Sequence, residues 1–318
     1  MHRWTDPSQT PAGLKPCVAT FGNFDGVHRG HQAVLDAVKT AARERDLPAV
    51  VVTFEPHPVR VLHPERAPEL ISPGVLRDHL IEETGVDGLL VLEFTREFAQ
   101  LSAEDYIRSV FVDGLGIAAL VVGQDTRGFG AGYTGDVDQL HELGARYGFD
   151  VIVLPDQGDN ERWSSSMIRG HLRDGEVDKA AEILGRPHRV LGTVVHGLQR
   201  GRDLGFPTAN LSQSSTGVVP ADGVYAGWFE RLDLPLDAPD RRLPAAISVG
   251  LNPTFADLTK VVVEAYVLDR TDLNLYGETV AVDFVAWVRP NQRFDSLDEL
   301  IAAIGRDVDE CRRILLGE

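Results

Sequence analysis

The feature that most constrains the fold is a change of pattern near the middle of the chain. Before it, short β-branched runs alternate with longer stretches of helical character; the runs read CVATFG, AVVVTF, LLVLEF, ALVVG and DVIVLP. Strands that alternate with helices in this way pair in parallel, so the first part is predicted to be an α/β doubly wound, Rossmann-like domain. Ligands of such sheets collect beyond the carboxyl ends of the strands. Three loops at those ends, GNFDGVHRGH, EPHP and GQDTRGFGAGYTGD, are therefore expected to converge.

The second part reads almost entirely as strands. After the segment GRPHRVLG the helical spacing stops, and the apolar runs are VLGTVVHG, GVYAGWFERL, PAAISVG, KVVVEAYVL and TVAVDFVAWV. Many short strands separated by turn residues predict a mostly β domain, either a barrel or a sandwich. Helical spacing returns after Ser296, and Glu299 three residues later is typical of a capped helix start. We therefore predict two domains, residues 1–185 and 186–318, the second closed by a C-terminal helix.

Composition limits the kinds of partner. The chain has 318 residues, 43% of them hydrophobic, which is enough for two packed cores. With 48 acidic and 31 basic residues the formal net charge is -17, which disfavours broad attraction to nucleic acid or to an anionic membrane. An anion would have to be held locally, by helix N-termini and single arginines. The two cysteines form no metal or disulfide pattern, and no apolar run is long enough for a bilayer, so we expect a cytoplasmic protein.

The stretch TFGNFDGVHRGHQ places two histidines, His28 and His31, just before a helical pattern. In that pattern Val34, Val38, Ala41 and Arg45 recur at helical spacing, so His31 is predicted to lie near a helix N-terminus. Metal binding, helix capping and phosphate chemistry would each place histidines here. No third ligand has metal-site spacing, and the HExxH order is absent. Gly22, Gly26 and Gly30 allow close backbone approach beside unpaired helix N–H groups, which favours phosphate chemistry.

At this point the chain resembles a known family. GNFDGVHRGHQ, TFEPHP and WSSSMIR are similar, in this order, to the nucleotidyltransferase module of the prokaryotic bifunctional riboflavin kinase/FMN adenylyltransferase (FAD synthetase) family. HGLQRGRDLGFPTANL, GVYAGW, AAISVGLNPTF and VVVEAYVLDRTDLNLYGE resemble its riboflavin kinase module. The resemblance implies that the second domain is a mostly β barrel with a C-terminal helix and that it phosphorylates riboflavin to FMN with ATP. It further implies that the first domain transfers AMP from ATP to FMN, giving FAD and pyrophosphate, and that Mg2+ accompanies ATP in both reactions.

The resemblance also implies roles for individual residues. The catalytic set it implies is His28, His31, Arg169 and Glu264. The ATP-binding set is Gly22, Asn23, Asp25, Gly30, Ser165, Ser166, Gly201, Arg202, Gly205 and Thr208. The flavin-binding set is Asp125, Phe129, Asn210 and Arg293, and the oxygen ligands of the metal are Thr208 and Asn210. His57 in EPHP is interpreted either as part of the nucleotide wall or as a structural residue between two prolines.

Glu264 is the candidate base of the kinase. Strict alternation in VVVEAYVL places Val262, Glu264, Tyr266 and Leu268 on one face of a strand, so a carboxylate interrupts an apolar row. If that face is buried, Glu264 needs a partner or a function, and the resemblance implies that it deprotonates the ribityl 5′-hydroxyl. A solvent-facing strand residue is the alternative.

One loop departs from the family pattern. Family members carry an aromatic residue where this chain has Thr126, and Gly128 looks like an added residue before Phe129. A degenerate first domain, leaving a monofunctional riboflavin kinase, is therefore one alternative; a non-catalytic flavin or nucleotide binding protein is another. Riboflavin, FMN and ATP are the expected partners, with neither nucleic acid nor membrane among them, and weak self-association is left open.

Overall fold

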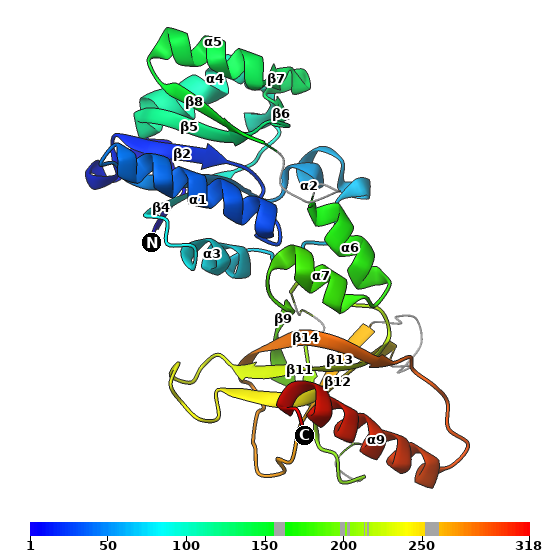
Figure 1. The fold of residues 1–318 in the computed structure, drawn as a ribbon. Helices are drawn as coiled ribbons and strands as arrows, with labels where there is room; N and C mark the ends of the chain where they lie inside the picture. Colours follow the sequence, from blue (N-terminus) through cyan, green and yellow to red (C-terminus); the bar gives the residue numbers. More distant parts are fainter. Residues whose placement is uncertain (156–162, 198–200, 202–203, 213, 215, 252–260) are drawn as a thin grey trace. The chain divides into compact units, whose positions relative to one another are not determined.

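The computed structural model describes residues 1–155, 163–197, 201, 204–212, 214, 216–251 and 261–318. The chain folds into two compact units (Figure 1). The first consists of Met1–Glu69 and Gly74–Ser164, and the second of Leu70–Pro73 and Ser165–Glu318. Arg202 lies outside the described residues, as does most of LNPTF in the AAISVGLNPTF motif.

The first unit is built on a six-stranded sheet in the order β1-β4-β3-β2-β5-β8, and every neighbouring pair is parallel. Its strands are β1 (His2–Trp4), β2 (Cys17–Phe21), β3 (Ala49–Glu55), β4 (Gly88–Glu93), β5 (Ile117–Gly123) and β8 (Asp150–Leu154). The doubly wound prediction is confirmed in all five predicted strands. Edge strand β1 was missed because only one of its three side chains, Trp4, is buried, so the sequence carries no apolar run there.

Helices cover both faces of this sheet. They are α1 (Arg29–Glu44), α2 (Pro58–Leu62), α3 (Val75–Glu82), α4 (Ala103–Tyr106), the π-helical η5 (Ile107–Leu115) and α5 (Val137–Tyr147). Short 3-10 turns are η1 (Pro7–Gln9), η2 (Ala12–Leu14), η3 (Pro64–Arg66), η4 (Phe98–Gln100) and η6 (Ala131–Tyr133), and β6 (Arg127–Phe129) pairs with β7 (Gly135–Asp136). Residues from α4, η5 and α5 pack in one core with the sheet, and α1 packs on β2, β3 and β5 outside that core.

The buried face of α1 is rotated from the predicted one. Leu35, Val38, Ala41 and Ala42 are buried, whereas Val34 is only partly covered. Arg45 follows the helix and donates a hydrogen bond to Asp150 instead of joining the core. Spacing alone could not distinguish two adjacent apolar stripes on a helix rich in alanine.

The second unit contains a closed barrel in the order β10-β13-β12-β11-β14-β9, and every neighbouring pair is antiparallel. Its strands are β9 (His188–Val195), β10 (Thr208–Leu211), β11 (Gly223–Arg231), β12 (Arg242–Leu251), β13 (Val261–Val267) and β14 (Thr279–Arg289). The alternative between barrel and sandwich is thereby settled. Strand β10 was missed because it is short and coincides with the TANL motif.

Alternate residues of β13 face opposite sides of the barrel wall. Val263 and Ala265 are paired with Val249 and Ile247 of β12, and all four are almost completely buried, which marks the interior. On the outer side, Tyr266 packs in a cluster with residues of α9 (Leu297–Leu316). The N-terminal cap of α9 is confirmed, because the Ser296 hydroxyl accepts a hydrogen bond from the backbone N–H of Glu299.

Two helices that precede the barrel belong to the same compact unit. They are α6 (Ser165–Arg173) and α7 (Val177–Leu184), which pack on each other, and α7 also packs on β14 and β9. The segment Leu70–Pro73 joins this unit as well, and a Cβ at Gly217 would lie only 3.2 Å from the carbonyl oxygen of Ile71. The compact units therefore divide before α6, whereas the predicted functional boundary at residue 185 falls after α7.

Candidate functional sites in the two units

The first site lies beside β2, where successive strands change from being added on one side of the sheet to being added on the other. Strand β2 is flanked by β3 and by β5, so the loops that follow these three strands share one edge of the sheet. The backbone N–H of Gly22 donates to the carbonyl oxygen of Val52, and the Thr53 hydroxyl lies 3.4 Å from the carbonyl oxygen of Asn23. These contacts join the first loop to β3, the strand that EPHP follows, and the predicted convergence of the loops themselves stays a prediction.

The loop between β2 and α1 has an unusual backbone. Phe24, Gly26 and Val27 have φ angles of 49°, 86° and 39°, all in the left-handed region. This region suits glycine but is strained for phenylalanine and more so for the β-branched valine. The side chains of Phe24 and Val27 are 2% and 1% exposed, so burial of both holds the strained loop in place. The Gln32 amide adds a 2.8 Å hydrogen bond to the carbonyl oxygen of Val27.

His28 forms the N-terminal cap of α1. Its Nδ1 accepts a hydrogen bond from the backbone N–H of His31 at 3.4 Å, and its side chain is buried. When neutral, an imidazole that accepts through Nδ1 carries its proton on Nε2. The capping interpretation is therefore correct for His28. Capping and phosphate chemistry are compatible at this residue.

The two histidine rings are stacked. Their centroids are 3.7 Å apart with an interplanar angle of 21°, and the edge of Phe24 packs on His31 at 5.2 Å. A Cβ at Gly30 would lie 3.1 Å from the His28 ring, so glycine there lets the imidazole lie close to the helix. The structure thus brings His28, His31 and Gly30 together, as the sequence predicted.

The remaining predicted residues of this loop differ in exposure. Asp25 is buried at 4% exposure, whereas Asn23 is exposed. A Cβ at Gly22 would lie 3.3 Å from the Phe24 ring, so close packing accounts for this glycine. His57 caps α2 by accepting from the backbone N–H of Val59, which gives it a structural role at the end of β3.

The loop after β5 contains the departure from the family pattern. Arg127 pairs with Asp136 and Phe129 with Gly135, so Gly128 is the extra residue of a β-bulge, with φ of 75°. The bulge allows the Phe129 ring to pack on Phe21 at 5.6 Å, where it is only 9% exposed. The added residue is therefore absorbed locally.

Other members of this loop lie at the surface of the same core. Asp125 and Thr126 are partly exposed, and a turn joins the N–H of Thr126 to the carbonyl oxygen of Gly123. Tyr106 packs on Phe21 beneath the loop, and its burial raises its pKa well above the usual value. The Phe129 ring thus has a structural role, and its contact with flavin stays a prediction.

Arg169, Ser165 and Ser166 lie on α6, in the second compact unit. The helix begins at Ser165, and Arg169 is buried at 7% exposure. These residues therefore belong to a different compact unit from His28, and their role in ATP binding stays a prediction.

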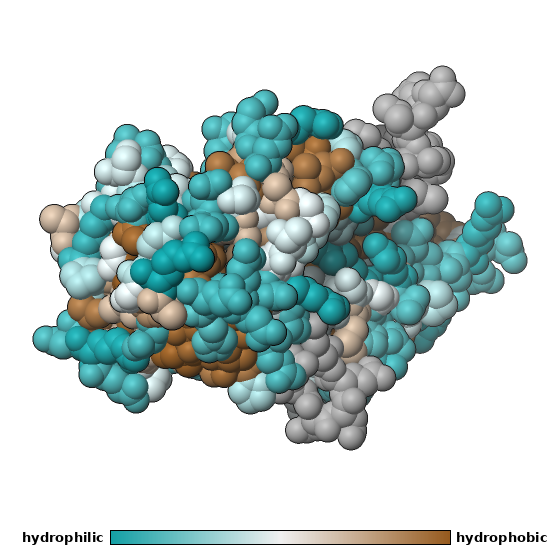
Figure 2. Space-filling view, turned by 90° about the horizontal axis from the view of Figure 1, so that it is seen from above, coloured by the Kyte–Doolittle hydropathy of each residue, from teal (hydrophilic) through white to brown (hydrophobic). Residues whose placement is uncertain are grey.

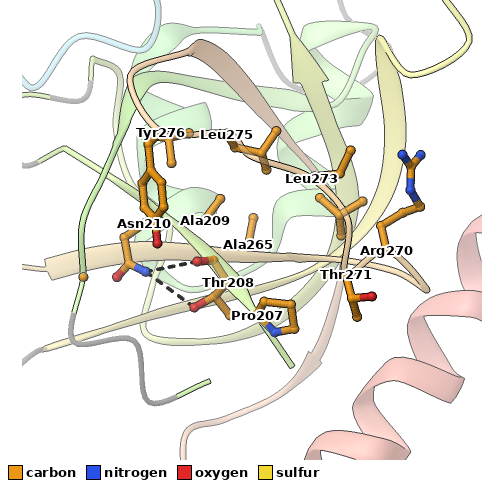
Figure 3. A pocket seen from close by; sticks show the side chains of 13 residues that line it. Pro207, Thr208, Ala209, Asn210, Ala265, Arg270, Thr271, Leu273, Leu275 and Tyr276 are labelled. Carbon is orange, nitrogen blue, oxygen red and sulfur yellow. Dashed lines mark hydrogen bonds between the residues drawn. The ribbon is translucent and has the colours of Figure 1, made fainter. Parts of the chain in front are cut away.

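The second site lies on β10 of the barrel. The Asn210 Nδ2 atom is 3.4 Å from the Thr208 hydroxyl and 3.5 Å from the Thr208 carbonyl oxygen (Figure 3). A Cβ at Gly197 would lie 2.5 Å from the Asn210 Oδ1, so only glycine fits there. A Cβ at Gly201 would lie 3.4 Å from the Thr208 hydroxyl, which brings this predicted residue next to Thr208. Gly205 has φ of 86° and forms the intervening turn.

A pocket with a volume of about 50 Å³ opens beside this pair. Ala209 and Ala265 form its small-residue wall, and Leu273, Leu275 and Tyr276 lie across from them (Figure 3). Tyr276 stacks on His196 with ring centroids 3.8 Å apart. The sequence analysis missed Gly197 and the three pocket residues of the DLNLYGE segment. That segment carries the family likeness, but its side chains gave no separate signal of a pocket.

Glu264 lies directly opposite Asn210. Register pairs Asn210 of β10 with Glu264 of β13, and Glu264 in turn with Ser248 of β12. Residues paired in this way share a face, with Cβ atoms about 5 Å apart. Glu264 is half-buried on the outer side of the barrel wall, so the row predicted by alternation is correct and its face is the outer one. Arg293 is exposed in the segment between β14 and α9.

The described residues contain no group of three or more His, Cys, Asp or Glu side chains that could hold a metal ion. In the same part of the chain no helix is long and apolar enough to cross a membrane. Hydrophilic residues cover much of the face in Figure 2, and hydrophobic ones appear in patches between them.

Two family models match successive parts of the chain. The FAD synthetase family model matches residues 10–167, and the riboflavin kinase family model matches residues 184–315. The bifunctional riboflavin kinase/FMN adenylyltransferase of Escherichia coli K12 is 40% identical over 94% of this chain and 92% of its own length. The enzyme of the same name from Pseudomonas fluorescens is 38% identical over 94% and 93%.

A solved structure has the same fold over its whole length. It is that of a protein named macrolide-efflux protein from Streptococcus pneumoniae, with a TM-score of 0.86, 32% identity and 98% coverage of both chains. The fold is thus shared end to end, and the curated relatives with comparable identity are enzymes of flavin nucleotide synthesis. The chain belongs to the bifunctional riboflavin kinase/FMN adenylyltransferase family.

Proposed function

We propose that the two reactions of this enzyme are divided between the two motif clusters, with riboflavin phosphorylated at the β10–β13 face of the barrel and FMN adenylylated at the β2–α1 loop. The observation that carries this division is the segregation of the clusters. His28 and His31 stack at the end of β2, whereas Thr208, Asn210 and Glu264 share one face of the barrel. We place the functional boundary at residue 185, so that residues 1–185 and 186–318 supply the two activities.

In the first reaction, riboflavin gives up the proton of its ribityl 5′-hydroxyl and the oxygen attacks the γ-phosphorus of ATP, with ADP leaving. Glu264 accepts that proton. Glu264 is paired with Asn210 in the register of the barrel, and Thr208 lies two residues before Asn210 on the same face of β10. The base is therefore adjacent to the side chains that hold the phosphates. Gly197 and Gly201 supply the close backbone approach that phosphates need.

The oxygen donors at Thr208 and Asn210 fit a magnesium ion. Both are uncharged hard ligands that lie two residues apart on the same face of β10, and two protein donors leave room for phosphate oxygens and waters. When bound, Mg2+ would neutralise charge on the phosphates of ATP.

In the second reaction, a phosphate oxygen of FMN attacks the α-phosphorus of a second ATP, and pyrophosphate leaves. We propose that His28 and His31, with Gly22, Asn23, Asp25 and Gly30 around them, hold the α-phosphate. The N-terminus of α1 and the His28 Nε2–H are donors preorganised by the buried loop, which is the arrangement that stabilises developing negative charge. Asp125 and Arg293 are proposed to contact flavin in their respective domains, and Arg169 to pair with ATP phosphates.

The alternative of a degenerate first domain was based on Thr126 and Gly128. The β-bulge at Gly128 keeps Phe129 in the core, so the insertion does not disturb the end of β5. Purified full-length enzyme incubated with riboflavin, ATP and Mg2+ should form FMN first and FAD later, as resolved by chromatography. Accumulation of FMN without FAD would favour the monofunctional kinase, and absence of both products would favour a binding protein.

A further inference from the structure

We infer that Ser248 is a specificity-determining residue of the kinase, whose hydroxyl hydrogen-bonds the ribityl chain of riboflavin beside Glu264. This inference rests on the proposed kinase site. It deepens that proposal by naming the direction from which the acceptor alcohol approaches the base.

The register of the barrel places Ser248 next to the base. Glu264 has two direct neighbours across the sheet, Asn210 on β10 and Ser248 on β12. All three side chains share a face, because residues directly opposite each other in an antiparallel pair point the same way. The base therefore lies between a phosphate-holding amide on one side and a serine hydroxyl on the other.

Ser248 is unusual among the outward residues of β12. Ala246, two positions earlier on the same face, packs in the apolar cluster beneath α9. Ser248 lies beyond that cluster and is partly exposed, and its hydroxyl makes no hydrogen bond to the residues that the structure describes. The packing of the barrel thus assigns this hydroxyl no structural role.

The two sides of Glu264 suit different substrates. On the β10 side, Thr208 and Asn210 belong to the phosphate-holding cluster, so the phosphoryl donor occupies that side. On the β12 side the same row continues from Ser248 to Val224 of β11 and then to Arg289 of β14. The exposed Arg293, proposed to contact flavin, follows in the next segment of the chain. The acceptor is therefore left with the side that Ser248 occupies.

A serine hydroxyl matches this acceptor chemically. It both donates and accepts a hydrogen bond, as each hydroxyl of a ribityl chain does. When the 5′-hydroxyl is at Glu264, a neighbouring hydroxyl of the chain can reach a side chain about 5 Å away on the next strand. The contact would bind riboflavin in its ground state and orient the 5′-oxygen without entering the chemical step.

The test uses full-length enzyme with Ser248→Ala and riboflavin as acceptor. We expect the KM for riboflavin and the Kd from flavin fluorescence to rise about 3- to 10-fold, the range for one neutral hydrogen bond. The kcat and the KM for ATP should stay within about twofold. Riboflavin analogues that each lack one ribityl hydroxyl sharpen the test. With the analogue that lacks the hydroxyl bound by Ser248, wild type and Ser248→Ala should have the same KM.

Ser212→Ala is the matched control, since it removes a hydroxyl at the end of β10 whose partner is Ser214. If Ser248→Ala lowers the melting temperature, Ser248→Thr and Ser248→Val are compared instead. Threonine and valine have nearly the same shape, but threonine has a hydroxyl where valine has a methyl group. An unchanged riboflavin KM in Ser248→Ala, or an equal rise with every analogue, would overturn the inference. Failure of the proposed function is distinct, because wild-type enzyme would then form no FMN or Glu264→Gln would remain active.

Discussion

The two candidate sites of this molecule are built in different ways. At the end of β2 the site is local: His28 and His31 are three residues apart and are fixed by a loop in which Phe24 and Val27 have positive φ angles. On the barrel the site is assembled by register, because Asn210 and Glu264 are far apart in the sequence and meet only when β10 pairs with β13. The local site at His28 and His31 depends on the strain and burial of one loop. The site at Asn210 and Glu264, called the register site below, depends on the whole barrel.

This difference predicts how each site responds to substitution. In the local site, one imidazole caps a helix and is also proposed to hold phosphate, so its structural and chemical contributions are combined. On the barrel, the closed hydrogen-bonded wall supports Glu264 whatever side chain stands there. A change at Glu264 should therefore alter chemistry alone, and a change at His28 should alter chemistry and local stability together.

The largest expected effect is at the barrel. Glu264→Gln keeps the size of the side chain but cannot accept the ribityl proton, so FMN formation should fall about 10³-fold, within the range for loss of a general base. The melting temperature should stay unchanged, because Glu264 is only half-buried on the outer wall. Both quantities are to be measured on one sample by a chromatographic kinase assay and a thermal melt.

The same variant also tests the independence of the two sites. Supplied with FMN and ATP, Glu264→Gln should form FAD at the wild-type rate. Loss of both activities in a folded protein would mean that the two sites are shared or coupled and are not separate.

The second effect separates the two contributions of His28. His28→Ala removes cap and imidazole, so FAD formation should fall by about 10²-fold or more and α1 should lose about 1 kcal/mol of stability. His28→Asn restores a good helix cap without the imidazole. We expect its stability to be near wild type while FAD formation stays as low as in the alanine variant.

His141→Ala, which changes an exposed histidine on α5, is the control for general effects of losing an imidazole. FMN formation should be unaffected in all three variants. Recovery of FAD formation in His28→Asn would show that capping is the whole role of His28.

The sequence predicted the parts of each site that local pattern can encode. The helix start near His31 and the capped final helix at Ser296 follow from spacing within a few residues, and the parallel sheet follows from the alternation of strands and helices. The pairing of Glu264 with Asn210 could not be predicted, because register depends on which strands close the barrel. Gly128 was recognised as an added residue, but only the pairing of β6 with β7 shows that a bulge accommodates it.

The third effect concerns the boundary between the units. Chain fragments that begin at Ser165 and at Gly185 both contain the barrel, but only the first keeps α6 and α7. Leu172 and Leu184 are almost fully buried, and the N–H of Ala221 donates to the carbonyl oxygen of Leu172. Since each buried leucine contributes about 1.5–3 kcal/mol, the longer fragment should be more stable by several kcal/mol in urea denaturation.

Both fragments lack the β2–α1 loop and contain the barrel site, so both should form FMN and neither should form FAD. Equal stability of the two fragments would show that α6 and α7 contribute nothing to the barrel and would move the structural boundary to residue 185.

The smallest effect uses one cysteine in each unit as a reporter. Burial raises the pKa of Cys17 and of Cys311 to about 12, so at pH 8 almost none of either thiol is ionised in the folded protein. Thiol alkylation, followed by mass spectrometry of peptides, should therefore be slow at both positions until the surrounding unit unfolds. Because the folded pKa is above the unfolded value near 9, each thiol contributes stability that is fully present below about pH 9 and is lost as pH rises toward 12.

If the units unfold independently, increasing urea should expose Cys17 and Cys311 at different urea concentrations. Simultaneous exposure would instead indicate one cooperative molecule, in which the local site and the register site share a single stability.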